Sequence, residues 1–142
     1  MVRSRAMSVL ALLALGLTLA GEAKAESSKP YTIDTRGTST QVVRGKSGVL
    51  KLQIVPAKGY KVSAEAPLKI SLSADGLSLT KAQLGHADQE DPKSTAPRFE
   101  VGFGANESGK RKIEAEAMFF VCSEELCEKR TEKLSVAVDV DG

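Results

Sequence analysis

The chain has 142 residues, with 20 Lys or Arg, 18 Asp or Glu and a formal net charge of +2. This length fits one domain of ordinary size. The balanced charge, without a basic run, argues against nucleic acid or an acidic membrane surface as the main partner.

Residues 1–25 have the pattern of a secretory signal peptide. Two arginines precede an apolar stretch, Val9–Ala20, and Ala23–Ala25 matches an A-x-A-like cleavage site. The apolar stretch is too short to span a bilayer, and Glu26 rather than a cysteine follows the cut, so no lipid anchor is indicated. Cleavage would leave 117 residues (142 less 25), with 17 positive and 17 negative side chains. We therefore expect an exported, periplasmic or secreted domain without stable membrane insertion.

The rest of the chain is expected to hold a short linker, residues 26–39, and one folded domain, residues 40–142. Apolar and polar residues alternate in most of this domain, which is typical of strands with one buried face. The apolar members of these runs are Leu50, Leu52 and Ile54; Leu68, Ile70 and Leu72; Leu77 and Leu79; Phe99, Val101 and Phe103; Ile113, Ala115, Ala117, Phe119 and Val121; and Leu134, Val136, Val138 and Val140. Turn residues separate the runs and no helical pattern is sustained, so the sequence predicts an all-β, antiparallel sandwich.

A polar segment, Gln83–Pro97, interrupts the strand pattern. A loop of this length inside a compact domain is often functional, although a solvated connection is the simpler interpretation. It contains the single histidine, His86, close to Asp88, Glu90 and Asp91. These residue types could bind a metal ion, but one histidine on a polar loop is more often only solvated.

The two cysteines of the chain, Cys122 and Cys127, are the most informative residues. In an exported protein they are expected to form a disulfide. If the strands before and after them pair as a hairpin, the loop Ser123–Leu126 places the two cysteines directly opposite each other. Opposed residues of a non-hydrogen-bonded pair have Cα atoms about 4.5 Å apart, which a disulfide can bridge.

The alternation indicates which way the two sulfur atoms point. Cys122 has the same phase as Glu116, and Cys127 the same phase as Ser135, so both are expected on the outer face, within reach of another protein's thiolate. A bond that closes six residues stabilises by only about 2 kcal/mol. This favours a redox role, while a purely structural bond stays open. A Cu(I) site from these thiols and Met118 would need reduced cysteines in an oxidising compartment, and no cofactor or metal is expected.

The region from Tyr60 to Val140 resembles the N-terminal periplasmic domain of the thiol:disulfide interchange protein DsbD. The similarity lies in the order of segments and in the hairpin cysteine pair, and the matching segments are LKISLSADGLSL, RFEVGF, ANESGK, IEAEAMFFVC and KLSVAVDV. The resemblance implies an immunoglobulin-like sandwich in which Cys122 and Cys127 cycle between dithiol and disulfide. It also implies thioredoxin-like or other thiol–disulfide exchange proteins as partners, and a loop at Gln83–Pro97 that covers the cysteines.

The sequence therefore leaves two alternative functions, in order of preference. The first is a periplasmic thiol–disulfide interchange module that uses Cys122 and Cys127, which leaves open whether the protein is an enzyme. The alternative is a non-catalytic, secreted binding or scaffold domain in which the same bond only staples a hairpin.

Overall fold

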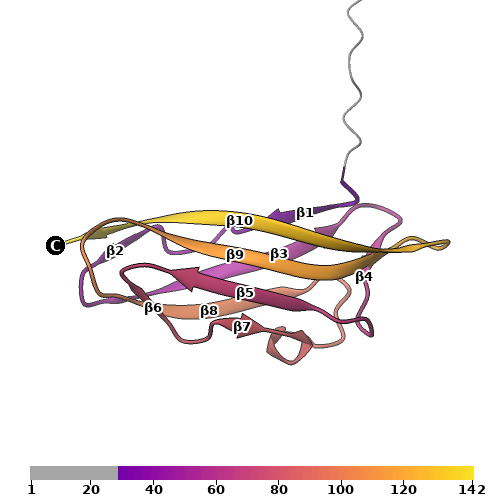
Figure 1. The fold of residues 1–142 in the computed structure, drawn as a ribbon, viewed down its shortest axis with the longest axis horizontal. Helices are drawn as coiled ribbons and strands as arrows, with labels where there is room; N and C mark the ends of the chain where they lie inside the picture. The colour runs from indigo at the N-terminus through magenta and orange to yellow at the C-terminus, as the bar shows by residue number, and fades with distance from the viewer. Residues whose placement is uncertain (1–28) are drawn as a thin grey trace, which may run out of the picture.

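The computed structural model describes residues 29–142, so the expected signal peptide and the first residues of the expected linker lie outside the described part. The described residues form two β-sheets packed face to face (Figure 1). The strands are β1 (Tyr31–Asp34), β2 (Gln41–Val43), β3 (Ser47–Pro56), β4 (Lys61–Val62), β5 (Lys69–Ala74), β6 (Leu77–Leu79), β7 (Gln83–Leu84), β8 (Arg98–Ala105), β9 (Gly109–Cys122) and β10 (Cys127–Asp141), with one 3₁₀ turn, η1 (His86–Asp88).

The sheets have an immunoglobulin-like topology. One has the order β1-β3-β8-β6, and the other has the order β2-β10-β9-β5-β7 with β4 also paired to β9. All pairs are antiparallel except β2 with β10, the first strand of the second sheet running parallel to the last strand of the chain. This is the strand arrangement of immunoglobulin-like sandwiches, which confirms the predicted fold class.

The core lies between the two sheets and follows the alternation of the sequence. Strand β9 alternates a buried apolar row with an exposed polar row, and β8 faces it with a row containing two phenylalanines. The largest fully buried side chains are Phe99, Phe103, Phe119, Leu50, Leu52, Ile54, Ile70 and Ile113. Burial of each such side chain contributes about 1.5–3 kcal/mol, so this two-layer core accounts for the fold without help from the cysteines.

The sandwich begins earlier than residue 40, where the sequence had placed the domain boundary. Strand β1 lies in the expected linker and pairs with β3, and Tyr31 is buried against Phe119 with ring centroids 4.9 Å apart. Tyr31 and Ile33 alternate with Thr32 and Asp34, but a run of four residues is too short to identify a strand by pattern alone, so the pairing with β3 and the contact with Phe119 define β1.

The carboxylate of Glu132, on β10, connects the two sheets on the side where β1 lies. The hydroxyl of Tyr31 and the ammonium of Lys29 both donate hydrogen bonds to Glu132, which points inward from β10. Burial and the hydrogen bond to Glu132 raise the pKa of Tyr31 well above its ordinary value, and the two donors hold the pKa of Glu132 below its own. The side chains thus close the side of the sandwich where β1 and β10 face each other.

Within residues 29–142 there is no helix of the length and apolar character needed to cross a membrane.

Candidate functional site

The hairpin of β9 and β10 positions the two cysteines. Its register is continuous from Val140 opposite Gly109 to Cys127 opposite Cys122. The connecting loop is closed by a hydrogen bond from the Ser123 amide to the Leu126 carbonyl, 2.8 Å long. Polar side chains outside and apolar ones inside hold this register, because a slip of one residue would reverse both faces.

The expected disulfide is formed. Cys122 and Cys127 are bonded, and their Cα atoms lie 3.9 Å apart. Both have the phase of the outward-facing residues of their strands, such as Glu116 and Lys133. The bond therefore lies on the outer face of the six-stranded sheet, as the sequence predicted.

The two cysteines lie on the outer face as expected, but they differ in exposure, which the sequence did not indicate. Cys127 is exposed, whereas Cys122 is only 5 % exposed. The reason is strand β4, which places Lys61 beside Cys122, and the continuation of this pairing by the amide of Ser63, which donates to the Phe120 carbonyl. A reagent that approaches from solvent therefore meets Cys127.

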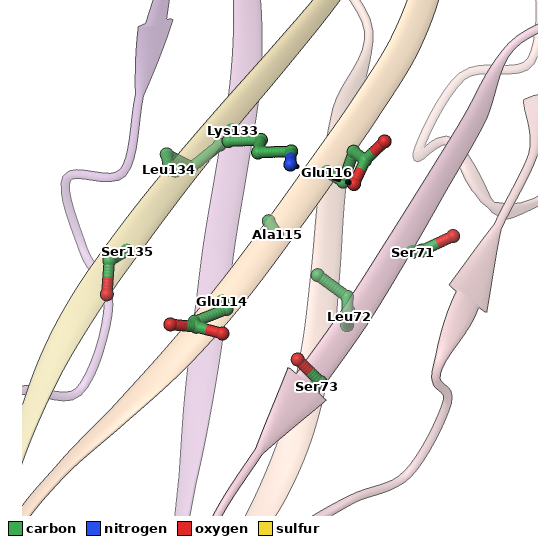
Figure 2. Close-up of a pocket in the computed structure, with 9 residues that line it drawn as sticks. All are labelled: Ser71, Leu72, Ser73, Glu114, Ala115, Glu116, Lys133, Leu134 and Ser135. Carbon is green, nitrogen blue, oxygen red and sulfur yellow. Dashed lines mark ion pairs between the residues drawn. The ribbon is translucent and has the colours of Figure 1, made fainter.

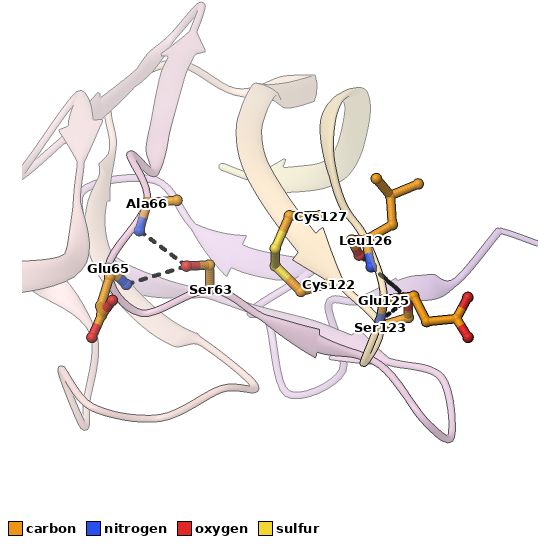
Figure 3. The surroundings of a disulfide bond; sticks show 8 residues. All are labelled: Ser63, Glu65, Ala66, Cys122, Ser123, Glu125, Leu126 and Cys127. Carbon is orange, nitrogen blue, oxygen red and sulfur yellow. Dashed lines mark hydrogen bonds between the residues drawn. A yellow bond between two sulfur atoms is a disulfide. The ribbon is translucent and has the colours of Figure 1, made fainter.

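The segment next to the disulfide is the β4–β5 connection (Figure 3). Ser63 starts a turn in which its hydroxyl accepts hydrogen bonds from the amides of Glu65 and Ala66, at 3.3 and 3.0 Å. Together with the hairpin loop on the other side, it forms the immediate surroundings of the bond. The neighbours of Cys122 therefore come from β4 and the turn at Ser63, and the residues drawn around the bond in Figure 3 include none from the polar segment for which a capping role was expected.

Gln83–Pro97 instead contacts the β4–β5 connection. His86 Nε2 is hydrogen-bonded to the Ala66 carbonyl at 2.6 Å, and the Thr95 carbonyl accepts the amide of Val62 at 2.9 Å. The segment is also more ordered than a simple loop, since it contains β7 and η1. Its structural effect is to hold the residues that lie beside Cys122.

Hydrogen bonds within the structure occupy both ring nitrogens of His86, and neither bond is to an acidic side chain. The second ring nitrogen, Nδ1, is hydrogen-bonded to the side-chain oxygen of Gln89 at 2.6 Å. Gln89 is buried, and its amide nitrogen donates to the carbonyls of Asp91 and Ser94. With both ring nitrogens engaged, His86 has no free ligand position, and residues 29–142 contain no group of three side chains suited to a metal ion.

Two exposed apolar residues lie near the cysteines along the chain and in the strand pairing. Leu126, which directly precedes Cys127, is 61 % exposed, and Tyr60, which directly precedes the strand beside Cys122, is 43 % exposed. Phe120, opposite Lys129, is half-buried on the outer face that carries the disulfide. The sequence pattern offered no signal for Tyr60, because its proximity to the cysteines depends on the pairing of β4 with β9.

A hollow on the outer face of the same sheet lies away from the cysteines (Figure 2). It measures about 440 Å³ and is bordered by side chains of β5, β9 and β10, with Ala115 at its centre. Its carboxylates have cationic neighbours, Lys112 at 3.0 Å from Glu114 and Lys133 at 3.9 Å from Glu116. It contains neither cysteine nor histidine, so the disulfide remains the candidate site.

Comparison with known proteins reveals similarity of fold only. No family model and no curated protein matches the chain. A lipoprotein from Bacteroides thetaiotaomicron is 11 % identical, with a TM-score of 0.50 over 86 % of this chain and 88 % of its own. A conjugative transposon lipoprotein from Bacteroides eggerthii is 11 % identical, with a TM-score of 0.47 over 78 % of this chain and 98 % of its own. Domains 4 and 5 of the S-layer protein SbsC are 15 % identical, with a TM-score of 0.46 over 78 % of this chain, which spans about half (51 %) of that fragment.

Proposed function

We propose that this protein is a periplasmic thiol–disulfide exchange domain whose partners are thioredoxin-like or other thiol proteins. The observation that carries the proposal is the position of the Cys122–Cys127 bond, at the tip of a hairpin with one cysteine exposed and the other buried. The expected signal peptide and the resemblance to the DsbD N-terminal domain support the compartment and the chemistry.

The asymmetry of exposure assigns an order to the exchange. A partner thiolate approaches from the exposed side and attacks the sulfur of Cys127, which forms a mixed disulfide and releases Cys122 as a thiolate that takes up a proton. A second thiol of the partner, as its thiolate, then attacks the partner's own sulfur in the mixed disulfide and releases the thiolate of Cys127, which is protonated in turn. Two electrons and two protons pass from the partner's dithiol to this domain, and the partner becomes the disulfide.

The surroundings of the bond suit repeated opening and closing. The hairpin ladder continues for fourteen opposed pairs, from Cys127–Cys122 to Val140–Gly109, so backbone hydrogen bonds retain the hairpin when the sulfurs separate. Leu126, which precedes Cys127, and Tyr60, which precedes the residue paired with Cys122, are exposed apolar residues available to a partner that approaches the hairpin tip. Both features support reversible exchange with another protein.

Two measurements test the proposal. Equilibration with glutathione should give a reduction potential above about −300 mV, because inert structural bonds in exported proteins lie below that value. In the native compartment, Cys122→Ala leaves the exposed thiol of Cys127 and should accumulate mixed disulfides with partner proteins. Cys127→Ala is the matched control, since it leaves only the thiol of the buried Cys122, and should trap much less.

The opposite results would identify the alternative function. A potential below about −300 mV, together with no covalent adduct from either single-cysteine variant, would mark the bond as a hairpin staple. The protein would then be a secreted binding or scaffold domain. Fractionation of cells that express the full chain tests the compartment separately, with recovery in the periplasmic fraction as the expected result.

A further inference from the structure

Strand β10 has a long edge without a backbone partner. On one side it pairs with β9 along almost its full length, whereas on the other side β2 covers only Asp139–Asp141. Among the described residues, none forms a backbone hydrogen bond to the open side of β10 between Cys127 and Val138. Unpaired edges of this length invite the addition of another strand.

The register shows which backbone groups face this edge. The amide of Asp139 donates to the Thr40 carbonyl, and the carbonyl of Asp141 accepts the Arg44 amide, so odd-numbered residues of β10 point away from β9. Backbone direction alternates along an antiparallel strand. The residues with N–H and C=O groups on the open edge are therefore Lys129, Thr131, Lys133, Ser135 and Ala137.

Charged side chains are present on this stretch, at Lys129 and Lys133 on the edge and at the inward-pointing Glu132, but two other devices that block strand addition, a bulge and a proline, are missing. The register with β9 is continuous, without a bulge, and residues 127–138 contain no proline. The hydrogen bonds of Tyr31 and Lys29 to Glu132 close the apolar core below the edge with side chains only. They leave the backbone of β10 free to pair.

The charges along the edge indicate the kind of strand that fits. Lys129 and Lys133 lie on the outer face, and no carboxylate of the described residues lies within ion-pair distance of Lys129. The side chain of Lys133 is 80 % exposed, and its ammonium is 3.9 Å from Glu116. The two lysines are four residues apart, or about 13 Å along a strand. Carboxylates at the same spacing in an added strand would lie opposite them, and opposite charges across strands stabilise pairing.

We propose that the edge of β10 from Lys129 to Ala137 binds an extended acidic segment of another protein by strand addition. Main-chain hydrogen bonds to the five outward residues supply affinity, and the two lysines select glutamate or aspartate at every fourth position. A second copy of this chain would bring the same two lysines rather than carboxylates, so it complements the edge less well. The inference does not depend on the redox proposal, because no sulfur takes part.

A synthetic peptide serves as the probe for this edge. It has nine residues of alternating threonine and valine, with glutamates replacing the residues at positions 3 and 7, and it is titrated into the oxidised protein. We expect saturable binding with hydrogen-exchange protection of the outward amides, Lys129 to Ala137, and at least a tenfold loss of affinity in the Lys129→Glu, Lys133→Glu double variant. A peptide with lysines in place of the glutamates should bind the wild-type protein at least tenfold more weakly.

Thr131→Pro tests the backbone contribution. This substitution removes an outward N–H without breaking the ladder to β9, and proline is tolerated on edge strands in this orientation. Peptide binding should fall at least tenfold, while Thr131→Val, which keeps the N–H, should bind like the wild type. A peptide methylated at alternate backbone nitrogens tests the same hydrogen bonds on the unaltered protein, whether or not the proline variant folds, and should not bind.

Three results would overturn the proposal. The first is absence of binding to the glutamate peptide at millimolar concentration. The second is equal affinity of the methylated and unmethylated peptides for the wild-type protein. The third is protection of the outward amides of β10 in the absence of peptide, together with a dimeric mass, which would assign the edge to a second copy.

Discussion

Replacement of both Cys122 and Cys127 by alanine should lower the free energy of unfolding by about 2 kcal/mol and leave the fold intact. The bond closes a loop of six residues, for which the chain-entropy relation gives about 7 cal/mol/K, or about 2 kcal/mol at 25 °C. On the native side, the β9–β10 ladder continues to the cysteines and does not depend on them. Alanine is preferred to serine because Cys122 is buried and a hydroxyl there would need a hydrogen-bond partner.

Urea unfolding followed by far-ultraviolet circular dichroism measures this difference. With a slope of about 1–3 kcal/mol/M, the midpoint of the double variant should fall by about 0.7–2 M, and the slope should not change. The wild-type protein with its disulfide reduced is the matched control and should unfold at nearly the same concentration. A loss above about 4 kcal/mol, or a variant that does not fold, would show that the bond maintains the sandwich and would refute the reasoning.

Three further substitutions test other contacts. Glu132→Gln should destabilise by about 1 kcal/mol at pH 7. The pKa of Glu132 is lowered in the fold, so the stability that its ionised carboxylate contributes is present above the ordinary glutamate pKa and is lost as the pH falls through the lowered value. The difference in urea midpoint between wild type and variant should therefore shrink towards pH 3. An equal difference at pH 7 and pH 3 would contradict this. Gly48→Ala should cost about 1–3 kcal/mol in thermal or urea unfolding, because its Cβ would lie 2.5 Å from the ring of Phe103, whereas Gly104→Ala, with 3.6 Å to its nearest neighbour, should cost less. His86→Ala should speed reduction of the disulfide by dithiothreitol, because it frees the segment beside the buried cysteine, and an unchanged rate would show that this segment does not limit access.

Local alternation was sufficient to predict the strands that form the core. The apolar rows of β9 and β8 have a buried face of period two, and the four residues between the cysteines fit a hairpin loop. From this pattern the bond between Cys122 and Cys127 and its outer face followed directly. Such features depend on contacts between residues that are close in the sequence, so the local pattern of one sequence predicts them.

Features that depend on distant pairing were missed. Strand β4 has only two residues, yet its pairing with β9 brings Lys61 beside Cys122 and buries that cysteine. Tyr31 was assigned to a linker because its contacts, to Phe119 and Glu132, are about ninety to one hundred residues away. No local sequence pattern predicts either contact, so only the structure shows how accessible each cysteine is.

The short loop between β9 and β10 also bears on the order in which the protein acquires its structure. Closing a loop of four residues costs little chain entropy, whereas β2 meets β10 only after almost one hundred intervening residues have been arranged. We therefore expect the two cysteines to meet when the hairpin closes, before the parallel pairing of β2 completes the sheet. Oxidation of the two thiols would need only this local step, so the disulfide would form while the rest of the sandwich is still assembling.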